Sequence, residues 1–409
     1  GMRPIDPRRG LDCLDCGERF DPAAETGRCP DCGGILDPTY DYDAVNLSLD
    51  SGAVGSMWRY DDLLPFPADA AVTLAEGGTP LVPAPQLAES WGVGAVWIKD
   101  EGRNPTGTFK DRGQSVAVTA ALEHDATDVA LASAGNAGQA AAAYAAAAGL
   151  DAHVFLPERA GFTQKAMVEV HGGDLSVADP LNGDSQIGDA GVALERALET
   201  HDWHPVQTFV TPYRHEGKKT MGYEILEQLD WAVPDGIVYP TGGGVGLVGI
   251  HKAARELREL GSVDELPGLY AAQSTGCAPI VEAYEQGRDR HEPWEDVDTV
   301  CGGIAIPDPG ASEVVLDAVR ESGGRAVATD DDDILDAALD VAQRVGVELA
   351  PTCASAVSGA AKLAAEGEFG PDDTVVILNT GAGNKDADVL RSHAGRRRHE
   401  RDYEGDDEE

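Results

Sequence analysis

Apolar runs of strand length alternate with longer helical segments through most of the chain. The runs at 95–99 (AVWIK) and 129–133 (VALAS) are typical of buried strands, whereas 138–148 is typical of a helix. Strands that alternate with helices predict parallel sheets with helices on both faces, which is the α/β class. At 409 residues the chain is long enough for two or three domains with a sizeable core.

The same alternation predicts the other elements after residue 111. Further strands are expected at 152–157, 174–179, 205–210, 236–240, 269–273, 325–330 and 374–379, and further helices at 163–170, 185–199, 218–229 and 247–260. No repeat of solenoid period accompanies them. We therefore expect one continuous series of strand and helix units.

The chain carries a formal net charge of −41, and its 72 acidic residues are spread over its whole length. Such a surface repels nucleic acid and anionic membranes. It resembles the surfaces of proteins from a salt-loaded cytoplasm, where molar salt screens self-repulsion, although an acidic mesophilic protein is the alternative. We find no secretory segment and no apolar run long enough to span a bilayer. We therefore expect a cytoplasmic protein with no nucleic-acid or membrane partner.

Four of the seven cysteines form two CxxC pairs with 12 residues between them, namely Cys13, Cys16, Cys29 and Cys32. Two such pairs can bring four thiolates into a tetrahedron, the geometry that Zn²⁺ favours in structural sites. The alternatives are a ribbon that has lost its metal or a pair of disulfides, which a reducing compartment disfavours. We expect residues 1–45 to form a zinc-ribbon-like segment whose closed site is structural.

Residues 104–113 (NPTGTFKDRG) place Lys110 in a setting that suits a reactive amine. Lysine is scarce here, with 8 lysines against 23 arginines, and Pro105 and Gly107 predict a tight turn before Lys110. A lysine forms a Schiff base only when its amine is neutral part of the time, which needs desolvation or a nearby cation. For this segment alone, an ordinary lysine at a loop–helix junction is an equally good interpretation.

Three further glycine-rich segments each follow a predicted strand: Ser133-Ala134-Gly135-Asn136, the run TGGGVG at 241–246, and Asn379-Thr380-Gly381-Ala382-Gly383. Free amides at such turns bind phosphates and carboxylates, and ligands of open α/β sheets collect at the carboxyl ends of strands. Each segment alone also fits a packing turn or a helix cap. Together with Lys110 they describe a cofactor that has a phosphate, a phenolic oxygen, a ring nitrogen and an aldehyde.

These motifs resemble those of a known family. The segments AEGGTPL (75–81), NPTGTFKDRG, SAGN, the glycine run and TGAGNKD (380–386) are similar to those of pyridoxal-phosphate enzymes of fold type II and, among them, the threonine synthases. The resemblance covers nearly all of 10–390, including the cysteine ribbon and the segment PYRHEGKKT (212–220). The lysine segment in combination with the others is specific for the fold and less specific for the substrate.

The resemblance implies a role for each motif. Lys110 would carry pyridoxal phosphate as a Schiff base and move protons at the substrate. Asn136 would hydrogen-bond the cofactor's phenolic oxygen, and Thr380 would meet its ring nitrogen. The cofactor's phosphate would be bound by Gly242, Gly243, Gly244, Val245 and Gly246. Ser133 would hold the substrate carboxylate, while Arg214, with Lys219 on the same segment, would receive the departing phosphate.

The resemblance also implies a domain plan and an activity. A large cofactor-binding domain would comprise 46–110 and 209–393, and 111–208 would form a small mobile domain. The tail, 394–409, changes from basic to acidic and is expected to be disordered. The implied reaction converts O-phosphohomoserine and water into threonine and phosphate, in a homodimer.

Several positions depart from the family's pattern. Ala134 and Ala137 stand where threonine synthases often have hydroxyl residues, and 207–214 (QTFVTPYR) lacks the usual asparagines and serine. Ala382 and Asn384 replace a histidine and a leucine in the closing motif. Either other residues bind the phosphate of the substrate, or the substrate carries a different leaving group. A serine/threonine dehydratase or a cysteine or cysteate synthase is therefore the alternative, and a non-catalytic interaction protein is the third interpretation.

Overall fold

The fold is described from a computed structural model, which covers residues 9–22, 27–47, 56–178 and 187–406. The chain divides into two compact units. The first unit comprises Gly1–Thr79, Asn104–Val233 and Val245–Leu266, and the second unit comprises Pro80–Arg103, Pro234–Gly244 and Pro267–Glu409. Both units combine helices with parallel-rich sheets, so the predicted α/β class is confirmed. No helix in the part of the chain that the structure describes is long and apolar enough to cross a membrane.

A small antiparallel sheet contains the cysteine pairs in the first unit. Its strands are β1 (Arg9–Cys13), β2 (Arg19–Phe20) and β3 (Leu36–Tyr40), in the order β2-β1-β3. Gly17 and Gly33 follow the second and fourth cysteines at φ of 75° and 76°, and each amide donates to a carbonyl one turn earlier. This left-handed conformation costs glycine little, so each CxxC pair closes into a tight turn.

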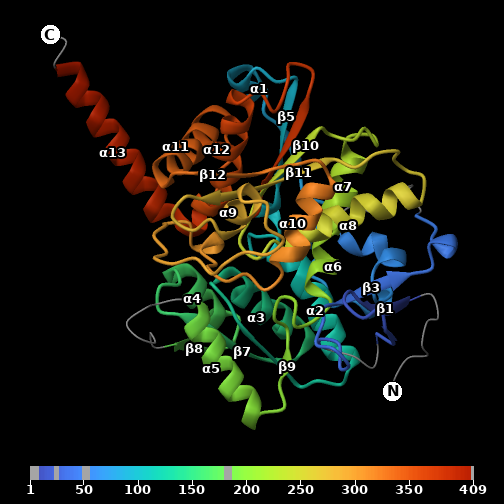
Figure 1. Ribbon diagram of the computed structural model, residues 1–409. Helices are drawn as coiled ribbons and strands as arrows, with labels where there is room; N and C mark the ends of the chain where they lie inside the picture. The colour runs from blue at the N-terminus through green and yellow to red at the C-terminus, as the bar shows by residue number, and fades with distance from the viewer. Residues whose placement is uncertain (1–8, 23–26, 48–55, 179–186, 407–409) are drawn as a thin grey trace. The chain divides into compact units, whose positions relative to one another are not determined.

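The first unit also contains a four-stranded parallel sheet, of which β7, β8 and β9 are labelled in Figure 1. Its order is β8-β7-β6-β9, with β6 (Asp128–Ala132), β7 (Asp151–Pro157), β8 (Asp174–Ala178) and β9 (His204–Pro205). Helices α3 (Asn136–Ala148), α4 (Phe162–Val170) and α5 (Ile187–Thr200) pack on it. Alternate residues of β6 point to opposite faces of the sheet. Val129 and Leu131 pack with α3, whereas Ala130 and Ala132 pack with α5.

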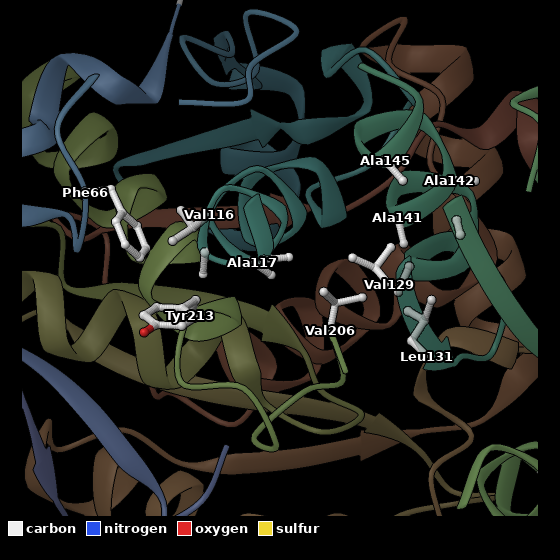
Figure 2. Close-up of a cluster of buried hydrophobic side chains, with 14 of the residues drawn as sticks. Phe66, Val116, Ala117, Val129, Leu131, Ala141, Ala142, Ala145, Val206 and Tyr213 are labelled. Atoms are coloured by element: carbon white, nitrogen blue, oxygen red, sulfur yellow. The ribbon is translucent and has the colours of Figure 1, made fainter. Parts of the chain in front are cut away.

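The larger core of the first unit extends from this sheet to the helices that hold the lysine segment. Figure 2 shows Val116 and Ala117 of α2 (Lys110–Glu123) in the same apolar cluster as Val206 and Tyr213. The other helices of this unit are α6 (Arg214–Lys218), α7 (Thr220–Gln228) and α8 (Val245–Glu259), with 3₁₀ turns at Tyr42–Ala44, Met57–Leu63 and Ala68–Ala70. Helix α2 contacts both α3 and α6.

The second unit is built on a six-stranded sheet of order β12-β11-β10-β13-β5-β4. The strands are β4 (Leu81–Pro83), β5 (Ala95–Asp100), β10 (Gly236–Pro240), β11 (Gly268–Ser274), β12 (Ala326–Thr329) and β13 (Thr374–Asn379). All pairs are parallel except β4 with β5. Ile98, Val238 and Ile377 pack together beneath α12 (Pro351–Ala365) in one apolar cluster.

The remaining helices of the second unit contact this sheet or one another. They are α1 (Pro85–Trp91), α9 (Pro279–Glu285), α10 (Ser312–Glu321), α11 (Asp331–Arg344) and α13 (Ala387–Asp406), with 3₁₀ turns at Glu101–Arg103, Gly302–Ile304 and Gly383–Asp386. The tail expected to be disordered is therefore helical to Asp406. Leu390 packs against α11, and His393 and Arg397 pair with Asp336 and Asp340 of that helix, which anchors the start of α13.

Two other elements differ from the predicted ones. The strand expected at 205–210 is reduced to β9, because Phe209 has a φ of 58° and 207–211 form a turn. The helix expected at 218–229 is divided, since α6 ends at Lys218 and α7 begins at Thr220. The compact units also group the chain differently from the predicted domain boundaries, and the mobile small domain at 111–208 stays a prediction.

Candidate active site

The segment before Lys110 is a hydrogen-bonded turn that ends at the first residue of α2. The amide of Gly107 donates to the carbonyl of Asn104 at 2.8 Å, with Gly107 at a φ of 82°. The Asp111 carboxylate accepts from both the amide and the hydroxyl of Thr106, which fixes the loop against the helix start. Burial raises the pKa of Asp111 to about 6. The predicted turn and helix start are therefore both present.

The amine of Lys110 lies in an apolar and cationic environment. Its Nζ is 4.9 Å from the centroid of the Phe109 ring, and the Nζ of Lys218 is 4.2 Å from the same centroid. Among the described residues no carboxylate pairs with either amine. Burial, and then the charge of Arg214, lower the pKa of Lys110 to about 7. Schiff-base chemistry requires a partly neutral amine, and a lysine pKa near 7 provides one.

Two glycines allow α6 to approach α2 closely enough to bring these cations together. A Cβ on Gly113 would lie 2.9 Å from the carbonyl oxygen of Arg214, and one on Gly217 would lie 2.1 Å from that of Arg112. Any side chain at either position would push the helices apart. Arg214 is 1% exposed and donates from Nη1 to the carbonyl of Val206 at 3.0 Å. The position of Arg214 is therefore fixed by the close contact between α6 and α2.

Lys219, which was expected near the substrate phosphate, lies instead among carboxylates. Its Nζ pairs with Glu216 and, at 3.0 Å, with Glu256. It also lies 4.4 Å from the centroid of the Tyr40 ring. All four side chains are buried. The contacts of Lys219 are those of a structural ion pair.

The same buried cluster includes a group that resembles a metal site. Asp37, His215 and Glu216 place one ligand atom each within 4.8 Å of one another. The Nζ of Lys252, however, lies 2.8 Å from both Asp37 Oδ1 and Glu216 Oε2. The Lys252 ammonium therefore occupies the position where a metal ion would bind. The cluster links β3 to α6 and α8.

Ser133 and Asn136 lie at the start of α3. The Ser133 hydroxyl accepts from the amides of Gly135 at 2.9 Å and Gly138 at 3.1 Å, so it caps the helix. Asn136 is half-buried, and its Oδ1 accepts from Gln164 Nε2 at 3.4 Å. Part of the predicted ligand-binding segment thus also serves as a helix cap.

The predicted phosphate loop begins at the carboxyl end of β10, in the second unit. A Cβ on Gly242 would lie 2.8 Å from the carbonyl oxygen of Gly303, and one on Gly244 would lie 2.3 Å from a methyl of Val315. Gly244 also has a φ of 76°. Glycine is therefore required at both positions, whatever the loop binds. Val245 and Gly246, the last residues of the predicted loop, open α8 and belong to the first unit.

Thr380 follows β13, the parallel neighbour of β10. The register pairs Val238 with Ile377, and three further residues along each strand bring Thr241 level with Thr380. The glycine loop and Thr380 therefore lie at the same edge of one sheet. The Thr380 hydroxyl is buried, and its Oγ1 is 3.1 Å from Cys353 Sγ. Burial raises the pKa of Cys353 to about 11, so the hydroxyl has a neutral partner.

The four cysteines of the ribbon converge as the CxxC pairs predict. All four Sγ atoms lie within 4.8 Å of one another, with 3.4 Å between those of Cys13 and Cys32 and 3.7 Å between those of Cys16 and Cys29. No disulfide joins them. This is a donor set of the kind that holds Zn²⁺ in structural sites.

A family model for pyridoxal-phosphate dependent enzymes matches residues 72–381. The chain belongs to that family. The match includes Lys110, Gly242, Gly244 and Thr380, and these residues fit the cofactor chemically. Lys110 offers a partly neutral amine, Gly242 and Gly244 form a loop with room only for backbone, and Thr380 is an uncharged hydroxyl.

Curated relatives show which enzymes within this family the chain is similar to. The chain is 39% identical to the threonine synthase of Methanosarcina acetivorans, over 93% of each protein. It is 34% identical to that of Methanocaldococcus jannaschii, over 92% of this chain and 93% of the relative. The threonine synthase of Mycobacterium bovis is 35% identical over 82% of this chain and 89% of its own length. The resemblance to threonine synthases that the motifs indicated is confirmed.

Solved structures support the fold. A threonine deaminase from Solanum lycopersicum matches with a TM-score of 0.65 at 22% identity, covering 78% of this chain and 83% of its own. A maize serine racemase matches with the same TM-score at 20% identity, covering 79% and 93%. These structural matches confirm that the chain has the fold known as type II among pyridoxal-phosphate enzymes.

Sequence reasoning missed two groups of the lysine site. Lys218 is adjacent to Lys219, and nothing local distinguishes the two. The second group is a buried network in which the Tyr144 hydroxyl donates to Glu76 at 2.7 Å and lies 3.3 Å from Asp111. Glu76 belongs to the AEGGTPL motif, so the motif itself was the available signal.

Proposed function

We propose that this protein is a threonine synthase, which converts O-phospho-L-homoserine and water into L-threonine and phosphate. The observation that carries the proposal is the surroundings of Lys110: a buried amine with a pKa of about 7, flanked by Arg214 and Lys218 and by no carboxylate among the described residues. A reactive amine beside the Arg214 guanidinium suits a substrate whose leaving group is a phosphate dianion. The similarity of this chain to the threonine synthases of three organisms supports the same substrate.

We assign the cofactor's contacts to the motif residues. Lys110 would hold pyridoxal phosphate through its amine, Asn136 would meet its phenolic oxygen and Thr380 its ring nitrogen. The backbone of Gly242 to Gly246 would take its phosphate. When bound, the cofactor draws electrons away from the substrate's α-carbon.

The chain's own residues move the protons and the anion. With its pKa near neutrality, the Lys110 amine takes a proton from the α-carbon and later returns one. A second proton leaves the β-carbon as phosphate departs from the γ-carbon. The γ-carbon then takes up a proton, and water adds at the β-carbon. Arg214 stabilises the departing phosphate, and the amides at Ser133 hold the substrate carboxylate.

The four-cysteine cluster is proposed to bind one structural zinc ion. The convergence of four unbridged thiols supports it. Four sulfur ligands fill a tetrahedral zinc, so no position is left for substrate or water.

We also propose that the enzyme acts as a homodimer in a salt-rich cytoplasm and binds no nucleic acid. The net charge of −41 supports the salt-rich setting, because molar salt is needed to screen it. The dimer rests on the family resemblance.

Product analysis tests the activity. Holoenzyme in molar KCl is given O-phosphohomoserine, and threonine and phosphate are measured together. Release of the two in equal amounts is expected. A serine/threonine dehydratase, which the apolar Ala134 and Phe209 favour, would instead release 2-oxobutyrate from threonine and no phosphate from phosphohomoserine.

A further inference from the structure

We propose that Lys218 binds the anionic leaving group of the substrate and replaces the polar contacts that this chain lacks elsewhere. The inference rests on the proposed function, because it names the residue that receives the phosphate of O-phosphohomoserine. Lys218 is the last residue of α6, one helical turn after Arg214, so the two cations leave the same face of that helix.

The burial of Lys218 has no structural explanation in the described chain. Its side chain is completely buried, and among the described residues its Nζ has no hydrogen-bonding neighbour except the amine of Lys110. Burying an ammonium without a partner is unfavourable. A lysine at this position therefore weakens the empty protein unless an anion binds to it.

Neighbouring buried lysines behave differently. Lys219 pairs with two glutamates, and Lys252 pairs with Asp37 and Glu216 at 2.8 Å. Both neutralise carboxylates of the cluster beneath β3. Lys218 points away from those carboxylates and contacts the face of Phe109. The chain thus leaves one buried lysine of this segment without an internal counter-charge.

The position of Lys218 matches the chemistry of the leaving group. Its Nζ shares the Phe109 ring with the Nζ of Lys110, so an anion held by Lys218 lies beside the reactive amine. Burial, and then the charges of Lys110 and Arg214, hold the pKa of Lys218 well below its usual range. A phosphate dianion would relieve that repulsion and restore the charged ammonium.

Two other polar side chains of the same segments are fully buried without partners. Gln114 lies one turn after Lys110 on α2, and neither its Oε1 nor its Nε2 is hydrogen-bonded. Thr211, three residues before Arg214, has an unpartnered Oγ1. Buried groups of this kind are rare in native proteins, and a bound ligand accounts for them. The Gln114 amide and the Thr211 hydroxyl are groups of the kind that can donate hydrogen bonds to a phosphate.

The test measures binding of inorganic phosphate to the holoenzyme by calorimetry. Wild type is compared with Lys218→Gln, which removes the charge, and Lys218→Arg, which keeps it. Lys362→Gln, at an exposed lysine of α12, is the matched control for loss of one positive charge. We expect Lys218→Gln to weaken phosphate binding by on the order of 10- to 100-fold. Lys218→Arg and Lys362→Gln should bind within a few-fold of wild type.

The same variants are assayed with O-phosphohomoserine. Lys218→Gln should raise KM for this substrate, and its thermal stability without phosphate should equal or exceed that of wild type. If Lys218→Gln binds phosphate as tightly as Lys362→Gln while wild type releases phosphate from O-phosphohomoserine, this inference is wrong and the proposed function stands. If wild type neither binds phosphate nor releases it, both are wrong.

Discussion

Arg112 and Glu224 form a two-pronged ion pair that fixes the start of α2 against α7. Nη1 of Arg112 lies 2.6 Å from Oε2 of Glu224, and Nη2 lies 2.8 Å from Oε1. Both side chains are buried, and Nη1 also donates to Thr220 Oγ1 at 2.9 Å. Because Arg112 is two residues after Lys110, this pair helps to position the reactive amine.

The first prediction concerns that pair. Glu224→Ala leaves the Arg112 guanidinium buried without its carboxylate, so the free energy of unfolding should fall by about 3–5 kcal/mol. Glu227→Ala is the matched control, since Glu227 pairs with Arg59 at a partly exposed position and should cost about 1 kcal/mol or less. Denaturant unfolding in molar KCl measures both. Equal losses for the two variants would show that the buried pair has no special role.

The second prediction concerns the pH dependence of cofactor uptake. The pKa of Lys110 is about 7 in the folded protein, below the ordinary value of 10.5, so its amine becomes neutral as pH rises through about 7. Uptake of pyridoxal phosphate by the cofactor-free protein, followed by visible absorbance, should increase through about pH 7 and level off above it. The folded protein disfavours the charged amine, so the unfolded chain binds more protons between about pH 7 and 10.5. Stability of the cofactor-free protein should therefore rise across that window.

Lys110→Met is the control for this pH dependence, because it lacks the titrating amine. The variant should show no visible band of bound cofactor and a smaller rise in stability between about pH 7 and 10.5. Uptake by wild type that continues to increase up to pH 10 would mean that the amine is not perturbed.

The third prediction separates the two adjacent lysines. Lys219→Met leaves Glu216 and Glu256 with one ammonium fewer, so the free energy of unfolding should fall by about 3–5 kcal/mol. In the folded fraction, KM for O-phosphohomoserine should stay near the wild-type value. A raised KM with unchanged stability would return Lys219 to the substrate site that the sequence predicted.

The fourth prediction concerns the ribbon. The purified protein should contain about one zinc ion per chain. Cys16→Ser or strong chelation should remove the metal and loosen the ribbon, as read by proteolysis near the N-terminal end, while activity is retained. Cys277→Ser, at a buried cysteine outside the ribbon, is the control and should keep its zinc. Full zinc content in Cys16→Ser would rule out the four-cysteine site.

Local patterns predicted the elements and motifs well, because they depend on neighbouring residues. The alternation of apolar runs predicted strands such as β6 and β13, and the CxxC spacing predicted the convergence of four thiols. The turn before Lys110 followed from Pro105 and Gly107. Each of these features is determined within a few residues.

The partners of the charged residues could not be predicted in the same way. Whether Lys218 or Lys219 faces the carboxylates depends on the break between α6 and α7 and on Glu256, which is distant in sequence. The helical tail was missed for a similar reason, because its first turns are held by Asp336 and Asp340 of α11. These contacts cannot be predicted from the composition of the chain.

We propose that Lys110 is the lysine that binds the cofactor. Holoenzyme is reduced with sodium borohydride, digested and analysed by mass spectrometry. We expect a reduced phosphopyridoxyl group on the peptide that contains Lys110, and none on the peptide that contains Lys218. The group on Lys218, or on no lysine, would contradict it.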